Sequence, residues 1–170
     1  MNVRIIGAVL IVGACGSLGV MIAAAYARQE RCLRKFADCL KFMRSDLQYS
    51  LTPLPELCRR TASQTSGVIK QFFICLVAEL EDQISPDVAC CVKAALLRVE
   101  GMPDTLKSII LHFGKTLGRF DIEGQVQSLE YSIEECNRKL AEMDCNKEMK
   151  LRNYKTLGLC AGAALAILFV

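Results

Sequence analysis

The sequence lacks tryptophan altogether, contains only one histidine, and has few aromatic residues, which make up 6% of the chain. Proteins that bind single-stranded nucleic acid need aromatic side chains on which bases stack. Neither sign of charge dominates, because 21 Lys and Arg residues against 18 Asp and Glu give a net charge of +3. Nucleic-acid-binding domains usually carry a clear basic excess. We therefore expect no nucleic-acid partner.

Motifs that indicate catalysis, metal binding or nucleotide binding are also absent. None of the ten cysteines forms a Cys-x-x-Cys pair, the short spacing common in zinc sites. Gly114-Lys115-Thr116 resembles the end of a phosphate-binding loop, but the glycine that this loop needs five residues earlier is Ile109. No nucleophilic residue lies at the distance in sequence from His112 that a catalytic motif would require. We predict a non-catalytic protein with no metal and no cofactor; a membrane enzyme with an unrecognised site is the third-ranked interpretation.

What the sequence has in excess is apolar residues, 52% of the chain, and they are concentrated at its two ends. Ile5 to Ala27 is a run of 23 residues without a charge, and a helix of that length spans about 34 Å, enough for a hydrocarbon core of about 30 Å. A cleaved signal peptide is the alternative, since Ala25-Tyr26-Ala27 fits a cleavage site. The run is longer than a signal peptide needs, which favours an uncleaved anchor over residues 1–27.

The second uncharged run is Thr156 to Val170, 15 residues long. It reaches about 22 Å as a helix, so spanning a bilayer needs local thinning. We predict a membrane segment over residues 156–170, with burial of this segment in a partner as the alternative. Basic residues follow the first run and precede the second. The positive-inside rule therefore places residues 28–155 in the cytoplasm. Those expected to contact anionic headgroups are Arg28, Arg31, Arg34, Lys35, Lys147, Lys150, Arg152 and Lys155.

The cytoplasmic segment, 28–155, reads as helical throughout. Apolar residues at 32, 36, 39, 40, 43 and 47 form one helical stripe. Thr52-Pro53, Ser85-Pro86 and Asp104 are helix starts, and Ser66-Gly67 is a break. The predicted fold class is all-α, a bundle of roughly six helices with N-terminal and C-terminal membrane helices. The last helix carries a coiled-coil-like seam of Val126, Leu129, Ile133, Cys136, Leu140 and Met143.

Two regions are candidate partner contacts. Residues 71–92 contain four acidic residues and no Lys or Arg, so a distal acidic patch is expected; a merely solvated bundle tip is the alternative. The segment from Gly114 to Asp121 connects two helices, and its glycines serve either an exposed turn or tight packing. The candidate contact residues are Glu79, Glu81, Asp82, Asp87, Phe113, Gly114, Lys115 and Gly118.

Three stretches resemble the stage III sporulation protein AB family of endospore-forming bacteria. They are Ser-Leu-Thr-Pro-Leu at 50–54, Phe-Gly-Lys-Thr-Leu-Gly at 113–118, and Leu-Gly-Leu at 157–159. The resemblance covers essentially the whole chain in length and order, and 113–118 is its most specific part. The ten cysteines are not a feature of the family, so the resemblance assigns them no role.

The resemblance implies a cytoplasmic domain like that of type II secretion F proteins, which are membrane platforms that dock a secretion ATPase. It further implies a non-catalytic scaffold in the channel between mother cell and forespore during engulfment. The protein would be a multi-pass protein in the mother-cell membrane around the forespore. Its partners would be the sporulation ATPase, stage III sporulation protein AA, and the other membrane proteins of the same operon.

The alternative function is a membrane-anchored helical regulator that homodimerises through the seam of its closing helix. The two functions differ in what happens to that seam. An exposed seam favours the homodimer, whereas a seam buried inside one chain favours the platform.

Overall fold

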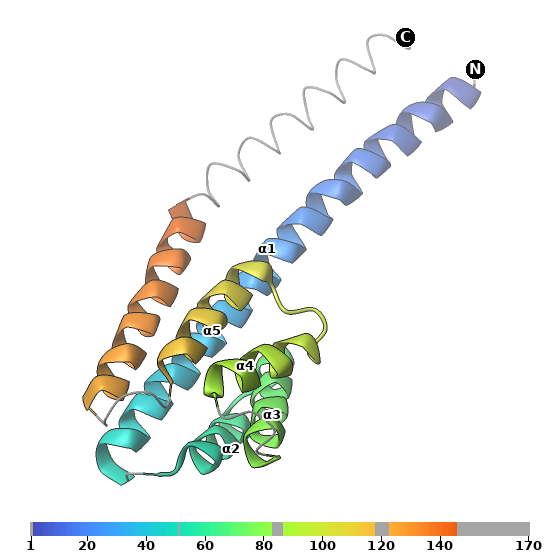
Figure 1. The fold of residues 1–170 in the computed structure, drawn as a ribbon. Helices are drawn as coiled ribbons and strands as arrows, with labels where there is room; N and C mark the ends of the chain where they lie inside the picture. The colour runs from blue at the N-terminus through green and yellow to red at the C-terminus, as the bar shows by residue number, and fades with distance from the viewer. Residues whose placement is uncertain (1, 51, 83–86, 118–122, 146–170) are drawn as a thin grey trace. The chain divides into compact units, whose positions relative to one another are not determined.

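The computed structural model describes residues 2–50, 52–82, 87–117 and 123–145, without the side chains of residues 2–20, 22 and 23 (Figure 1). The chain divides into two units, one of residues Met1–Arg28 with Ala141–Val170 and the other Gln29–Leu140. The C-terminal segment 156–170, the four basic residues predicted before it (Lys147, Lys150, Arg152 and Lys155) and Gly118 lie outside the described residues. Within the described residues, no helix is long and apolar enough to cross a membrane.

The described residues form six helices and no strand, which confirms the all-helical prediction. Five of the helices carry labels in Figure 1. They are α1 (Asn2–Ser50), α2 (Leu54–Gln64), α3 (Val68–Glu81), α4 (Val88–Leu97) and α5 (Asp104–Thr116). The sixth, residues 123–145, is orange in Figure 1 and is called the closing helix below.

The predicted stripe on α1 is buried in the core of the Gln29–Leu140 unit. Its members, Cys32, Phe36, Cys39, Leu40, Met43 and Leu47, are each at most 8% exposed. Phe36 lies at the centre, with its ring centroid 6.4 Å from that of Phe73 on α3 and 6.1 Å from that of Phe113 on α5. Full burial of one such side chain contributes about 1.5–3 kcal/mol. The stripe therefore joins α1 to two helices that follow it much later in the sequence.

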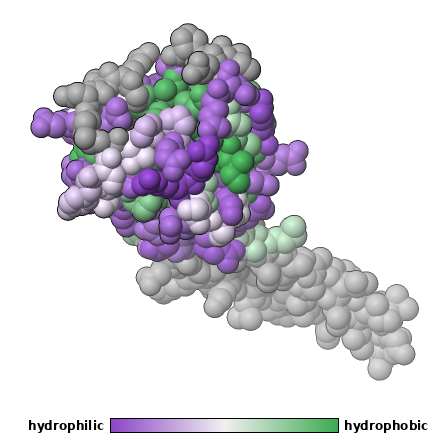
Figure 2. All heavy atoms as spheres, turned by 90° about the horizontal axis from the view of Figure 1, so that it is seen from below, coloured by the Kyte–Doolittle hydropathy of each residue, from purple (hydrophilic) through white to green (hydrophobic). Residues whose placement is uncertain are grey.

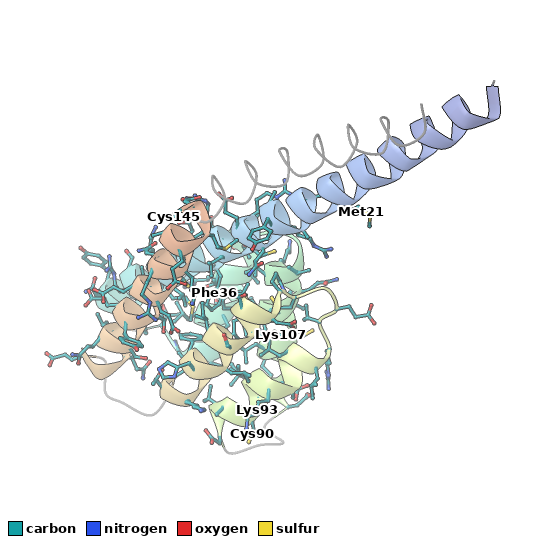
Figure 3. All side chains as sticks on the ribbon, turned by 90° about the horizontal axis from the view of Figure 1, so that it is seen from above. Met21, Phe36, Cys90, Lys93, Lys107 and Cys145 are labelled. Carbon is teal, nitrogen blue, oxygen red and sulfur yellow. The ribbon has the colours of Figure 1, made fainter. Side chains whose placement is uncertain are left out.

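Helices α2 to α5 pack in chain order, α2 on α3, α3 on α4, and α4 on α5. The break predicted at Ser66-Gly67 is present, because Gly67 adopts a φ of +73° between α2 and α3. Backbone in that region disfavours residues with a Cβ, so glycine suits the turn. The side chains of this unit can be followed in Figure 3, where Phe36 is labelled.

Three helix starts differ by one or two residues from the sequence prediction. Pro53 is the N-cap of α2 rather than its first residue. Pro103 is the N-cap of α5, so Asp104 lies in the first turn, where its carboxylate accepts a 2.8 Å hydrogen bond from Lys107 Nζ. Asp87 caps α4 by accepting the N–H of Ala89 at 3.1 Å. Ser85 and Pro86, predicted to start α4, lie outside the described residues.

The seam of the closing helix is buried within the chain. Leu129 and Cys136 are fully buried, and Ile133 and Leu140 are each 7% exposed. The two ends of the seam, Val126 and Met143, are half-buried. Polar contacts join the same helix to α1 and α5: Arg44 Nη1 donates to Glu130 Oε1 at 3.3 Å, and Ser128 donates to Thr116.

Candidate functional site

Most acidic residues of the predicted patch make contacts within the chain. Glu79 is buried, and its Oε1 lies 2.7 Å from Arg98 Nη2 at the end of α4. Glu81 pairs with Arg59 of α2, and Asp87 caps α4. Asp82 is exposed. The structure therefore corrects the expectation that Glu79 offers a partner contact, because its charge faces inward and is neutralised within the chain.

Glu79 also sets the environment of a neighbouring thiol. The Sγ of Cys91 donates to the backbone oxygen of Glu79 at 3.6 Å, and Cys91 is buried between α3 and its own helix, α4. Burial, with the Glu79 carboxylate as a second cause, raises the pKa of Cys91 above its ordinary value. The thiol is therefore held in its protonated form and acts as a packing group rather than a nucleophile.

Ion pairs link the first three helices along the surface of the unit. Arg60 contacts Asp46 of α1 at 3.4 Å and Glu56 at 3.2 Å. Arg59 contacts Glu56 at 2.8 Å and Glu81 of α3. Hydrogen bonds from the two arginines lower the pKa of Glu56. Because acids and bases alternate along this chain of contacts, it presents no strong field of one sign to a partner.

Residues 113–117, the most specific part of the resemblance, form a junction of helices. Phe113 packs edge-to-face on Phe36 of α1, and Gly114 faces Val92 of α4. Thr116 accepts a hydrogen bond from Ser128 of the closing helix and donates one to the Phe113 carbonyl at 2.9 Å. Lys115 alone is exposed. Phe113 and Gly114 are thus corrected from partner contacts to packing residues.

A groove lies beside this junction, between α5 and the closing helix. It has a volume of about 340 Å³ and is lined by His112, Thr116, Gly124, Gln127, Ser128 and Tyr131. The rings of His112 and Tyr131 lie with centroids 5.7 Å apart. Sequence reasoning singled out His112 but missed the groove, because its residues come from two helices whose pairing no local pattern reveals.

The predicted headgroup contacts on α1 divide into two groups. Arg34 pairs with Glu30 at 3.0 Å, and Lys35 Nζ donates to Ser66 Oγ at 2.6 Å. Arg28 and Arg31 are exposed. All four residues are therefore exposed, and Arg34 and Lys35 also contact residues within the chain.

The cysteines whose side chains the structure describes are free thiols that range from exposed to buried. Cys90 and Cys145 are exposed, and Cys90 is labelled in Figure 3. Cys58 and Cys136 are buried, which raises the pKa of each to about 12, with Glu135 as a second cause at Cys136. No cluster of three or more His, Cys, Asp or Glu side chains suited to a metal ion occurs in the described part of the chain.

Comparison with known proteins gives concordant matches. The family model for stage III sporulation protein AB matches residues 4–170. Stage III sporulation protein AB of Bacillus subtilis (strain 168) is 24% identical over 170 residues, covering 98% of this chain and 99% of the relative. A solved structure of stage III sporulation protein AB (SpoIIIAB) superposes with a TM-score of 0.61 at 16% identity, over 72% of this chain and 98% of that one. This structural similarity shows that the two proteins share a fold.

Proposed function

Because the chain belongs to the stage III sporulation protein AB family, we propose that it is a non-catalytic membrane platform of the sporulation channel between mother cell and forespore. In this role the Gln29–Leu140 unit docks the sporulation ATPase, stage III sporulation protein AA. The terminal segments tie the unit to the membrane and to the other membrane proteins of the operon. The protein lies in the mother-cell membrane around the forespore, with its central domain in the cytoplasm.

Membrane attachment is proposed from the sequence of the two ends. The 23 uncharged residues from Ile5 to Ala27 belong to the continuous helix α1. Backbone groups within a helix satisfy one another, which is what a segment in lipid requires. The second attachment is the uncharged segment 156–170. Exposed Arg28 and Arg31 follow the first run directly, where anionic headgroups contribute about 1 kcal/mol per charge.

The observation that carries the platform role is the burial of the closing-helix seam within one chain. Leu129 and Cys136 have no exposed surface, and Ile133 and Leu140 have little. The homodimer alternative needs this seam to be free for a second copy, and the monomer already uses it. A rigid helical unit with an internally satisfied core suits a scaffold on which other proteins assemble.

The experiment is affinity capture of the full-length protein from sporulating cells after crosslinking and detergent solubilisation, with partners identified by mass spectrometry. We expect recovery of the ATPase together with the operon's membrane proteins. The matched control is a Leu129→Asp variant, whose buried charge should unfold the unit and abolish the recovery of the ATPase. Recovery of a self-crosslinked dimer without the ATPase would contradict the platform role.

A further inference from the structure

The groove between α5 and the closing helix is small and open, which suits one side chain of a partner protein rather than a small molecule. Its volume is about 340 Å³, at the lower end for ligand pockets. Of the residues that line it, His112 and Gln127 are exposed and Tyr131 is 55% exposed. Small-molecule sites enclose most of their ligand. A side chain that projects from another protein's surface needs no such enclosure.

The two hydroxyl groups of the lining can accept hydrogen bonds but have already donated their protons. Thr116 donates to the Phe113 carbonyl at 2.9 Å, and Ser128 donates to Thr116. A hydroxyl carries one proton and two lone pairs, so Ser128 Oγ keeps its lone pairs for an incoming donor. The charged groups of lysine and arginine only donate hydrogen bonds. The hydroxyl pair therefore favours a cationic side chain over a carboxylate.

The aromatic rings of the lining favour arginine among the cations. The rings of His112 and Tyr131 line the groove together, with centroids 5.7 Å apart. A guanidinium group stacks on an aromatic face because it is planar, and its charge is attracted to the ring. Lysine carries a compact charge without a planar surface. An arginine side chain thus matches both the exposed ring of Tyr131 and the acceptor at Ser128.

Carboxylates flank the lining along the closing helix. Glu123 lies four residues before Gln127, and Glu134 lies three residues after Tyr131. Residues three or four apart are neighbours on a helix surface, so both carboxylates border the groove. Both are exposed, and neither forms an ion pair within the described residues. They are therefore available to the positive charges of a partner.

The basic residues near the groove do not reverse this acidic character. Arg44 contacts Glu130 at 3.3 Å, so this pair is neutral as a whole. Lys115 is exposed on α5 but does not line the groove. Arg138 is exposed one turn beyond Glu134 and so lies farther from the lining. Because potentials across protein interfaces are complementary, a basic segment is the favoured occupant.

We propose that the groove binds an arginine side chain from a basic segment of the partner ATPase, stacked on Tyr131 and donating to Ser128. Glu123 and Glu134 are eleven residues apart, about 16 Å along a helix, so they contact further basic residues of the same segment. The inference rests on the proposed function and adds to it the docking surface and the chemistry of the segment that docks.

The first test measures dissociation constants for the purified full-length protein in detergent and the purified ATPase of the same organism. Glu134→Lys should weaken binding about tenfold, because it places a like charge beside the arginine. Glu100→Lys, at an exposed position outside the lining, is the matched control and should stay within about twofold. Circular dichroism melts check that each variant is folded, as expected for exposed positions.

A second pair of variants tests the stacking contact. Tyr131→Leu keeps an apolar side chain but removes the aromatic face, and should weaken binding about fivefold to tenfold. Tyr131→Phe keeps the ring and should stay within about threefold. A merely apolar contact would treat the leucine and phenylalanine variants alike, and that result would overturn the arginine assignment.

Photocrosslinking tests the position of the surface independently. Benzoylphenylalanine replaces Ser108, which is exposed on α5 one turn before His112, or Lys70, which is exposed on α3 and serves as the control. We expect crosslinks to the ATPase from position 108 and none from position 70. The crosslinked ATPase peptide should contain arginine.

The outcomes separate this inference from the proposed function. Unchanged or tighter binding by Glu134→Lys overturns the basic occupant, while ATPase binding by the wild type upholds the platform role. A lack of crosslinks to the ATPase from position 108, or crosslinks from it to a second copy of this chain, also overturns the groove assignment. Absence of any ATPase binding by the wild type overturns both.

Discussion

A Cβ atom on Gly114 would lie 2.8 Å from both Cβ and Cγ1 of Val92, closer than side-chain atoms normally approach. The contact joins α5 to α4, so the missing side chain sets the distance between these helices. We predict that Gly114→Ala lowers the free energy of unfolding by about 1–3 kcal/mol through overpacking. Chemical denaturation of the full-length protein in detergent, followed by circular dichroism, measures this loss.

Two variants control for that prediction. Lys115→Ala, at the exposed neighbouring position, should change stability by less than about 0.5 kcal/mol. Val92→Ala combined with Gly114→Ala should recover part of the loss, because it removes the two γ-carbons that the new Cβ would meet. A double variant whose losses simply add would contradict the packing explanation.

The buried thiols predict a loss of stability at alkaline pH. Burial raises the pKa of Cys58 and Cys136 from 9.0 to about 12, so the folded protein retains protons that the unfolded chain releases above pH 9. Their stabilising contribution is therefore complete below pH 9 and is lost progressively as the pH rises from there toward 12.

Denaturation midpoints measured from about pH 8 to about pH 10.5 test this linkage. The Cys58→Ala, Cys136→Ala double variant should show a shallower slope than the wild type above pH 9. A Cys90→Ala variant, which removes an exposed thiol, should keep the wild-type slope. Equal slopes in all three proteins would rule out the buried thiols as the source.

Residue types did not predict which acidic side chains are accessible. The acidic residues of 71–92 were recognised as a group, but the direction in which each one points depends on how α3 meets α4. Glu79 faces Arg98, and the sequence separates these two residues by a segment that carries no pairing signal. The same limit hid the groove, which needs both Thr116 and Ser128.

At the scale of the helix, burial of the closing-helix seam predicts a large loss of stability when one of its residues is truncated. Leu129→Ala should lower the free energy of unfolding by about 2–5 kcal/mol, since it leaves a cavity at a fully buried position. Gln127→Ala, two residues earlier and exposed, should have an effect below about 0.5 kcal/mol. Equal losses for the two variants would mean that the seam is not part of the core.

The same pair of variants distinguishes the platform from the homodimer. Light scattering of the detergent-solubilised protein should give the same oligomeric state for Leu129→Ala and the wild type, because the seam packs within one chain. Dissociation of a dimer by Leu129→Ala would instead indicate that the seam joins two copies.

The periodicity of apolar residues predicted which segments are helical, but it predicted the ends of the helices less accurately. The stripe on α1 was predicted position by position, because a 3.6-residue period repeats over several turns. Ends depend on single residues, and two candidate caps close together compete. Pro103 took the N-cap of α5 that the sequence assigned to Asp104, and Asp104 gained the bond to Lys107 instead.

For the whole molecule, the two uncharged ends predict membrane integration. The full-length protein expressed in cells should remain in the membrane pellet after alkaline carbonate extraction, since about 20 apolar residues suffice for one crossing. A variant with arginine at both Val12 and Leu18 should be extracted more readily than the wild type, because each charge at mid-bilayer costs about 2.5–3.5 kcal/mol on insertion scales. Extraction of the wild type would contradict the anchor.

The contact between Phe36 and Phe113 has a consequence for synthesis on the ribosome. Helices α2 to α5 meet their neighbours as each emerges, but the apolar stripe of α1 must wait for α3, which supplies Phe73, and then for α5, which supplies Phe113. At about 5–20 residues per second, this stripe faces the cytosol for several seconds before its partners exist. The nascent chain thus passes through an interval in which this apolar helical face depends on chaperones or on the nearby bilayer for protection from aggregation.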